Sequence, residues 1–262
     1  MDLGLGGRGA VVTGGSLGIG RAVVLELARE GASVMCVARN PANLAETVRQ
    51  SEGLEGRVIP IEQDCSEPAA AQVVVEQAKE ALGQIDILVN NLGNGWLGHD
   101  WRTEDETWEY VMNFNLYSAV RFAREAIPQM QENGYGRIIN MSSVSGHSGF
   151  PEMGDYNASK AAMIMWSKTI SRELAPTITV NSLCPACIAT PLWDNLAKQL
   201  TGVAGETVEE VYENVAKENL VLGRYGTPEE VSGLCAFLAS ERAAFITGVA
   251  YNVDGGFTNF AF

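Results

Sequence analysis

Short runs of apolar residues alternate along the chain with longer segments in which apolar residues recur every three or four positions. Residues 32–38 form an almost unbroken apolar run, which is typical of a strand buried on both faces of a sheet. Ile19, Val23 and Leu27 have helical spacing, and Gly31 follows where that helix would end. The short runs predict strands at residues 9–13, 32–38, 57–61, 85–89, 136–141, 177–183 and 249–253.

The intervening segments predict helices, and several of them begin with recognisable capping residues. Asn40-Pro41 combines a cap with a first-turn proline. Residues 103–106 and 227–230 both have the Thr-x-x-Glu spacing of a capping box. The predicted helices cover residues 19–30, a segment starting at 41, and residues 66–82, 104–132 (in two pieces), 156–174 and 227–240.

Strands that alternate with helices predict an α/β fold of the Rossmann type, a doubly wound parallel sheet with helices on both faces. No boundary, repeat or low-complexity tract divides the sequence, so residues 1–262 are expected to form a single domain. Residues 190–225 break the alternation, because they are polar and only partly helical. An insertion beyond the carboxyl end of a strand is expected to act as a lid over a site.

Composition narrows the possible partners. The chain has 262 residues, 46% of them hydrophobic, which is enough for a large core. Its 32 acidic residues outnumber 18 basic ones, and the formal net charge of −14 argues against nucleic acid or an anionic membrane as partner. No targeting segment and no apolar stretch of membrane-spanning length is found, so a cytoplasmic protein is expected.

The five cysteines are odd in number and scattered, which argues against a disulfide framework. Cys184 and Cys187 form a Cys-x-x-Cys pair that could serve redox chemistry or metal binding. The favoured interpretation is two small residues near a strand end, because no second pair and no nearby histidine completes a zinc site. His99 and His147 have no metal-binding spacing either, so no metal is expected.

A glycine-rich turn, Gly14-x-x-x-Gly18-x-Gly20, follows the first predicted strand and opens the first helix. Glycines at such a turn let the backbone approach a pyrophosphate, and the helix N-terminus offers amide donors to it. The alternative is a plain tight turn. The position between a strand and a helix favours dinucleotide binding.

The end of the second strand bears on the choice of dinucleotide. NAD sites usually place an acidic residue there for the ribose 2′-hydroxyl. Residues 31–45 contain no acid, and Arg39 is in a position where its guanidinium could pair with a 2′-phosphate. NADP(H) is therefore the preferred cofactor and NAD(H) remains possible, since Arg39 could instead be solvated.

Tyr156 and Lys160 are four residues apart, so on a helix they share one face. A nearby ammonium favours the phenolate and is expected to bring the pKa of the tyrosine towards neutrality. By itself Tyr-x-x-x-Lys is common. Its setting favours chemistry, because it follows a short apolar strand and then a hydroxyl pair, Ser142-Ser143.

The ordered set of motifs resembles the short-chain dehydrogenase/reductase family, and the match covers nearly the whole chain. The motifs are Thr13-Gly14-x-x-x-Gly18-x-Gly20, Asn90-Asn91-Leu92-Gly93, Asn115, Ser143, Tyr156-x-x-x-Lys160, and Asn181 with Pro185 and Thr190. The resemblance implies transfer of a hydride between the nicotinamide of NADP(H) and a carbonyl or secondary alcohol.

The resemblance also implies roles for individual residues. Tyr156 would be the general acid and base, Ser143 would hydrogen-bond the substrate oxygen, and Lys160 would lower the pKa of Tyr156 and bind the nicotinamide ribose. Asn115 would hold a water linked to Lys160, and Asp64 would contact the adenine. The residues expected around the cofactor are Gly14, Ser16, Leu17, Gly18, Ile19, Gly20, Arg39, Asp64, Cys65, Asn91, Gly93, Tyr156, Lys160, Pro185, Ile188 and Thr190.

The chain departs from the family pattern at two positions. Leu92 stands where the family has alanine, and Ala186 where it has glycine, so the pocket beside the nicotinamide is expected to change shape. The remaining candidates are apolar and aromatic with a few polar groups, which suits a small apolar or cyclic ketone. The expected substrate residues are Trp96, Ser143, Val144, Ser145, His147, Met153, Cys187 and Trp193.

Two other functions remain open: an NAD-dependent alcohol dehydrogenase, and a non-catalytic dinucleotide-binding redox sensor on the same fold. The set of Asn115, Ser143, Tyr156 and Lys160 favours an enzyme, because a sensor has no chemical need for all four. The resemblance also implies a homotetramer or homodimer assembled through the helices at residues 104–132 and 156–174.

Overall fold

The computed structural model describes residues 2–95, 97–204 and 207–259, and its centre is a seven-stranded parallel sheet. The strand order is β3-β2-β1-β4-β5-β6-β7, and every neighbouring pair is parallel. The strands are β1 (Gly9–Thr13), β2 (Ser33–Ala38), β3 (Val58–Glu62), β4 (Ile87–Asn90), β5 (Gly136–Met141), β6 (Ile178–Pro185) and β7 (Ala250–Val253).

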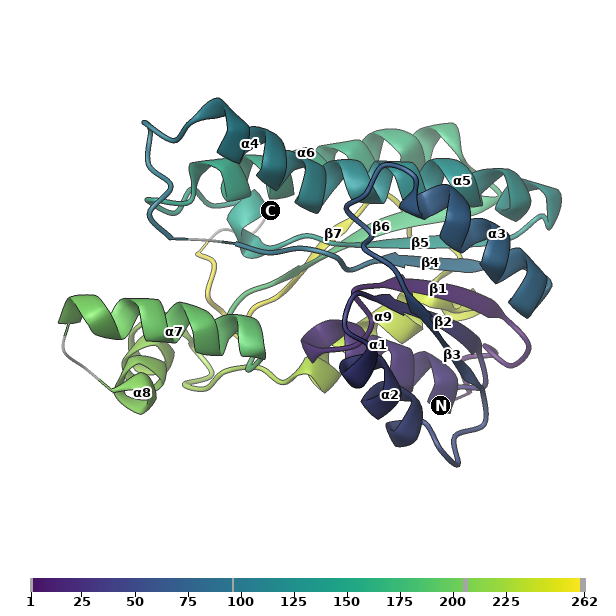
Figure 1. Cartoon of the computed structure of the whole chain (residues 1–262), viewed down its shortest axis with the longest axis horizontal. Coiled ribbons are helices and arrows are strands. Elements are labelled where there is room, and N and C mark those ends of the chain that lie inside the picture. Colours follow the sequence, from purple (N-terminus) through teal and green to yellow (C-terminus); the bar gives the residue numbers. More distant parts are fainter. Residues whose placement is uncertain (1, 96, 205–206, 260–262) are drawn as a thin grey trace.

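Helices cover both faces of this sheet. Figure 1 shows α3, α5 and α6 on one face and α1, α2 and α9 on the other. The helices are α1 (Gly18–Arg29), α2 (Pro41–Gln50), α3 (Ala70–Leu82), α4 (Asp105–Met112), α5 (Ser118–Glu132), α6 (Gly154–Glu173), α7 (Pro191–Ala204), α8 (Val208–Asn219) and α9 (Pro228–Ala239). The predicted fold class, a doubly wound parallel sheet, is confirmed.

The two layers of helices arise from the alternation of side chains along buried strands. In β1, Ala10 and Val12 pack in the core beneath α1 and α9, whereas Val11 packs in the core beneath α3 and α5. Every residue of β1 is buried. A strand covered on both faces can be apolar throughout, and this explains the unbroken apolar runs in the sequence.

The strand order places a topological switch between β1 and β4. From β1 the chain moves outward through β2 and β3, then returns to pair β4 with the other side of β1. Ligands of open α/β sheets bind in the crevice that such a switch leaves at the carboxyl ends of the strands. The segments after β1, β4, β5 and β6 all begin at that edge.

The segment predicted as a lid consists of two helices, α7 and α8, which project beyond the sheet at the left of Figure 1. A capping box that the sequence analysis missed starts α8. The amide of Thr207 donates to Glu210 Oε2 at 2.7 Å, and the amide of Glu210 donates to Thr207 Oγ1 at 3.2 Å.

Two helix starts differ from their predictions. The predicted capping box at Thr103 is wrong, since α4 begins at Asp105 after Glu104 and no side chain caps it. Helix α3 begins at Ala70 rather than at residue 66, because Ser66 is held in a turn by Asp64. The backbone amide and the hydroxyl of Ser66 both donate to Asp64 Oδ1. The second predicted box is confirmed at Thr227.

All five cysteines are unpaired and buried. Across the part of the chain that the structure describes, no helix is both long and apolar enough to cross a membrane. Within the same residues, no group of three or more His, Cys, Asp and Glu side chains is placed to hold a metal ion.

Candidate active site

A single cavity of about 580 Å³ runs along the carboxyl edge of the sheet. It is lined by the glycine-rich turn after β1, by the segments after β4, β5 and β6, and by residues of α7 and α8. The cavity therefore connects the predicted cofactor end with the predicted lid.

The glycine-rich turn has the geometry that a pyrophosphate needs. Gly14 and Gly18 have positive φ angles of 63° and 52°, and a Cβ on Gly14 would lie 3.1 Å from Asn91 Nδ2. Helix α1 begins after Leu17 without a side-chain cap, so no side chain occupies its N-terminal amides. Those amides and the positive end of the helix dipole fit a bound phosphate.

Asn91 connects the end of β4 to this turn. Its side-chain amide donates to the carbonyl oxygens of Thr13 and Gly14, each at 3.1 Å, and its backbone amide donates to Thr13 Oγ1 at 3.1 Å. Gly20 faces the same place, because a Cβ there would lie 2.1 Å from the Gly14 carbonyl oxygen. Side chains at these positions are therefore fixed or absent, which keeps the turn open to a dinucleotide.

Arg39 and Asp64 lie together at the ends of β2 and β3. Arg39 Nη1 is 3.4 Å from Asp64 Oδ2, and the arginine side chain is 62% exposed. Burial alone would raise the pKa of Asp64, but hydrogen bonds from Ser66 and Arg39 lower it by a larger amount. The pKa of Asp64 is therefore below its ordinary value. Cys65 is buried, and burial raises the pKa of its thiol to about 12. None of Arg39, Asp64 and Cys65 is among the described residues that line the cavity, and neither is Ser16.

Ser143, Tyr156 and Lys160 meet in the middle of the cavity, although they come from the segment after β5 and from α6. Ser143 Oγ hydrogen-bonds the Tyr156 hydroxyl and accepts from the Ser145 amide at 3.1 Å. Burial raises the pKa of Tyr156, and the hydrogen bond with Ser143 opposes this only in part. At neutral pH the tyrosine hydroxyl is therefore protonated and able to donate.

Lys160 corrects one expectation of the sequence analysis. Its Nζ donates to the Met141 carbonyl oxygen at 2.9 Å and lies 5.6 Å from the centre of the Tyr156 ring. Burial lowers the pKa of the ammonium to about 8. The pKa of Tyr156 is raised rather than lowered, because burial outweighs the hydrogen bond with Ser143. Ser142 supports this residue, since its hydroxyl donates to the Lys160 carbonyl oxygen at 2.9 Å.

Asn115 lies behind Lys160, in a π-helical turn (Asn113–Tyr117) that separates α4 from α5. Its side chain is fully buried. Oδ1 accepts from the Asn94 amide at 2.9 Å, while Nδ2 donates to the Asn94 carbonyl oxygen and to Ser159 Oγ. Gly93 packs directly against Lys160 and Asn115 and leaves no room for a side chain. A Cβ on Gly93 would lie 2.7 Å from Lys160 Nζ and 3.4 Å from Asn115 Oδ1.

Several predicted substrate residues line the far end of the cavity. These are Val144, Ser145, Met153, Cys187 and Trp193. His147 is exposed and is not among the described lining residues, so the structure does not bring it to the predicted pocket. Trp96 lies outside the described residues.

The same end contains apolar residues that the sequence analysis missed. They come from the loop after β4, the segment before α6, the two lid helices and the C-terminal segment; they are Leu97, Phe150, Pro151, Leu192, Leu196, Val215 and Phe257. Trp193 is held against this wall, since its Nε1 donates to the Ala186 carbonyl oxygen at 3.3 Å and its ring meets Tyr225 edge-on at 5.3 Å. In the sequence these residues stand out only as apolar, and an apolar residue can either line a pocket or pack in the hydrophobic core.

Most of the expected cofactor residues do line the cavity. They are Gly14, Leu17, Gly18, Ile19, Gly20, Asn91, Gly93, Tyr156, Lys160, Pro185, Ile188 and Thr190. Leu92 and Ala186, the two departures from the resembled family, line it as well. The arrangement can hold a dinucleotide along the turn and offer a hydroxyl donor to a carbonyl oxygen beside it.

Comparisons with known proteins agree with this geometry. Residues 14–258 match the family model described as enoyl-(acyl carrier protein) reductase. The monensin polyketide synthase ketoacyl reductase of Streptomyces virginiae is 39% identical over 260 residues, covering 97% of this chain and 98% of that protein. The 3-oxoacyl-[acyl-carrier-protein] reductase of Thermotoga maritima is 36% identical over 253 residues, covering 96% and 98%.

Solved structures include a similar protein. L-Sorbose reductase from Gluconobacter frateurii, complexed with NADPH and L-sorbose, superposes with a TM-score of 0.94. It is 37% identical, and the match covers 99% of this chain and all of that one.

Proposed function

Because the chain belongs to the short-chain dehydrogenase/reductase family, whose members act on CH–OH and C=O groups, we propose that it uses NADP(H) to interconvert a small, largely apolar or cyclic ketone and its secondary alcohol. One observation supports this proposal above the others. Ser143, Tyr156 and Lys160 lie in the same cavity as the glycine-rich turn, between the cofactor end and an apolar end.

In the direction of reduction, a bound nicotinamide supplies hydride to the carbonyl carbon. The Tyr156 hydroxyl, kept protonated by its raised pKa, donates its proton to the carbonyl oxygen. The Ser143 hydroxyl, already hydrogen-bonded to Tyr156, stabilises the negative charge that develops on that oxygen. The buried ammonium of Lys160 favours the same charge and faces the part of the cavity where the nicotinamide ribose would bind.

The preference for NADP(H) is supported by Arg39, which is exposed beside the glycine-rich turn and can pair with a 2′-phosphate. The solved structure of L-sorbose reductase contains NADPH. NAD(H) is the second candidate, and one observation favours it. Arg39 already has a partner in Asp64, and a paired guanidinium has less charge to offer a phosphate.

The substrate class is inferred from the lining of the cavity. Among its described lining residues the only charged side chain is Lys160, and the far end is dominated by Leu97, Phe150, Trp193 and Phe257. Such a surface gains more from burying an apolar ketone than from binding a polyol or a phosphorylated sugar. Helices α7 and α8 serve as the lid of this end.

The test begins with a titration of NADPH and NADH, followed by turnover with cyclic and aryl ketones and with L-sorbose as a polar comparison. We expect tighter NADPH binding, preference for the apolar ketones, and loss of turnover by about 10²–10⁴-fold in Tyr156→Phe with cofactor binding intact. Cofactor binding without turnover of any ketone or alcohol would favour a redox sensor instead. Faster turnover of L-sorbose would refute the proposed substrate class.

A further inference from the structure

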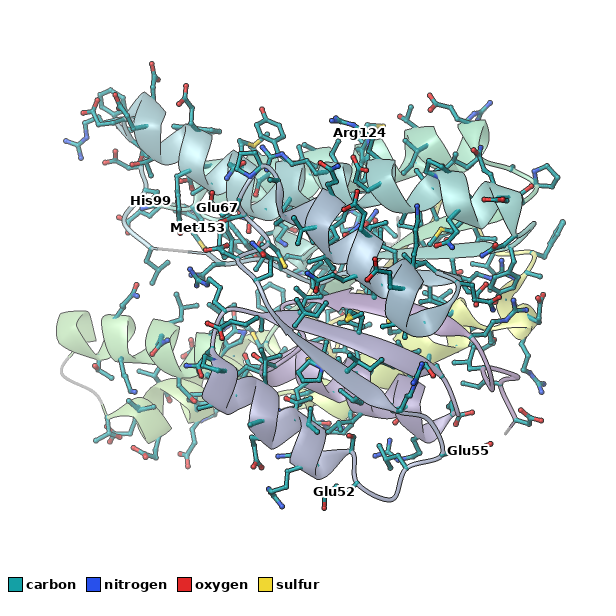
Figure 2. All side chains as sticks on the ribbon, turned by 45° about the vertical axis from the view of Figure 1, so that its right-hand side comes forward. Glu52, Glu55, Glu67, His99, Arg124 and Met153 are labelled. Carbon is teal, nitrogen blue, oxygen red and sulfur yellow. The ribbon has the colours of Figure 1, made fainter. Side chains whose placement is uncertain are left out.

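The loop that joins β4 to α4 is tied to the turn before α6. The backbone amide of His99 donates to the Glu152 carbonyl oxygen at 3.0 Å, and the amide of Gly154 donates to the His99 carbonyl oxygen at 3.4 Å. These bonds make a short parallel bridge between His99 and Met153, which lie together in Figure 2. The tie therefore ends two residues before Tyr156.

The His99 side chain adds a second tie through a buried carboxylate. His99 Nδ1 lies 2.6 Å from Asp155 Oδ2, with the aspartate side chain fully buried and the histidine 23% exposed. The other carboxylate oxygen, Oδ1, accepts from the backbone amide of Tyr156 at 2.7 Å. One carboxylate in the first turn of α6 thus joins the loop to the residue that carries the reacting hydroxyl.

The turn between these contacts is held in an unfavourable backbone conformation. Glu152 has a φ of 57°, which residues other than glycine rarely adopt. Such a conformation persists only where the surrounding structure fixes it. The bond from the His99 amide to the Glu152 carbonyl oxygen is one of the contacts that fix it. The positions of loop and turn are consequently interdependent.

Both sides of this connection form the substrate end of the cavity. Leu97 lines it from the loop and Met153 from the turn. Gly95, in the same loop, packs closely on Tyr156, because a Cβ there would lie 3.3 Å from ring carbons Cδ2 and Cε2. A shift of the loop would therefore move the apolar wall and the surface on which the tyrosine ring rests.

We propose that His99 is a positioning residue: through Asp155 it fixes the loop after β4 against α6 and so sets the distance between the substrate wall and the Tyr156 hydroxyl. His99 is not among the residues that line the cavity, so it acts through the loop rather than on the substrate. This inference rests on the proposed function, because it assigns His99 to the same reaction.

Steady-state kinetics of His99→Ala provide the first test. We expect the KM for the ketone to rise at least about tenfold, because a shifted loop would withdraw part of the apolar wall that Leu97 and Met153 supply. The KM for NADPH should stay within about twofold, because none of the hydrogen bonds of the tie involves the glycine-rich turn. An unchanged ketone KM, or equal increases in both constants, would overturn the proposal.

Conservative and control variants separate positioning from general damage. His99→Asn can still donate from near the place of Nδ1, so it should restore most of the lost ketone affinity. Arg102→Ala removes an exposed ion pair with Asp100 and a contact with the exposed Trp101 ring in the same loop, and should leave all constants unchanged. If His99→Ala does not fold, His99→Gln replaces it as the mispositioned variant. Equal ketone KM values for His99→Asn and His99→Gln would then overturn the proposal.

Hydrogen exchange tests the tie without any turnover. The amides of His99 and Gly154 are donors in the bridge, so they should be protected in the wild type and should exchange at least about tenfold faster in His99→Ala. If the wild type reduces no ketone, the proposed function fails while this measurement still reports on the tie. Exchange that is the same in both proteins would show that the His99 side chain fixes nothing.

Discussion

Replacing Gly93 with alanine should separate catalysis from folding, because the new methyl group meets mainly the end of one flexible side chain. A Cβ on Gly93 would lie 2.7 Å from Lys160 Nζ and 3.4 Å from Asn115 Oδ1. Ordinary contacts of such atoms begin at about 3.5 Å, so the ammonium has to withdraw by roughly 1 Å. The backbone around Gly93 can stay where it is.

The size of the effect follows from the bond that the ammonium gives up. Lys160 Nζ donates to the Met141 carbonyl oxygen at 2.9 Å, and a shift of this size breaks that bond. A hydrogen bond to a charged group contributes about 1.5–3 kcal/mol. Because each ~1.4 kcal/mol is tenfold in rate, kcat/KM should fall by about tenfold to a hundredfold. Without the Met141 carbonyl oxygen as acceptor, the buried ammonium is less stabilised, so its pKa should fall below about 8.

The assay compares kcat/KM for ketone reduction with the midpoint of thermal unfolding in the same preparations. Gly149→Ala is the matched control, since a Cβ at Gly149 would meet no atom within 4 Å. It should change neither quantity. The reasoning would be refuted if Gly93→Ala kept kcat/KM within about twofold of the wild type. It would also be refuted if the loss of kcat/KM were matched by a lower midpoint of thermal unfolding.

Two further predictions concern the cofactor and the pH. Arg39→Ala should raise the KM for NADPH at least about tenfold and leave the KM for NADH within about twofold of the wild type, measured in parallel titrations. Equal effects on the two constants would show that Arg39 does not bind the 2′-phosphate. Reduction needs the ammonium of Lys160, whose lowered pKa is about 8. The kcat/KM for ketone reduction should therefore be constant below pH 8 and fall about tenfold per pH unit above it. A kcat/KM that is still constant up to about pH 10 would contradict this.

The strands and most helices could be predicted because their cause is local. A strand buried on both faces can be apolar along its length, as residues 34–38 are. The failures also have local causes. Spacing alone predicts the Thr103 capping box, but the chain turns into α4 only at Asp105. The predicted start of α3 is too early because Ser66 hydrogen-bonds Asp64 instead of entering the helix.

The grouping of Ser143, Tyr156 and Lys160 is expected from the ordered family motifs, and the structure brings all three to one cavity, with Ser143 just after β5 and the other two in α6. The apolar end was not predictable, because Val215 and Phe257 reach the cavity only through the packing of the lid and the C-terminal segment. His99 and Asp155 are 56 positions apart, and no spacing rule pairs them. The pKa of Tyr156 depends on burial, which the Tyr-x-x-x-Lys spacing does not report.

The π-helical turn before α5 sets helix stability against the placement of one side chain. A π turn holds one residue more than the same stretch of α-helix and is intrinsically the less stable form. Losing one residue there would restore a regular helix, but it would rotate Asn115 by about 100°, away from Asn94 and the space behind Lys160. Selection for stability alone would favour the shorter helix. The extra residue is therefore a site where stability is given up for the placement of one amide.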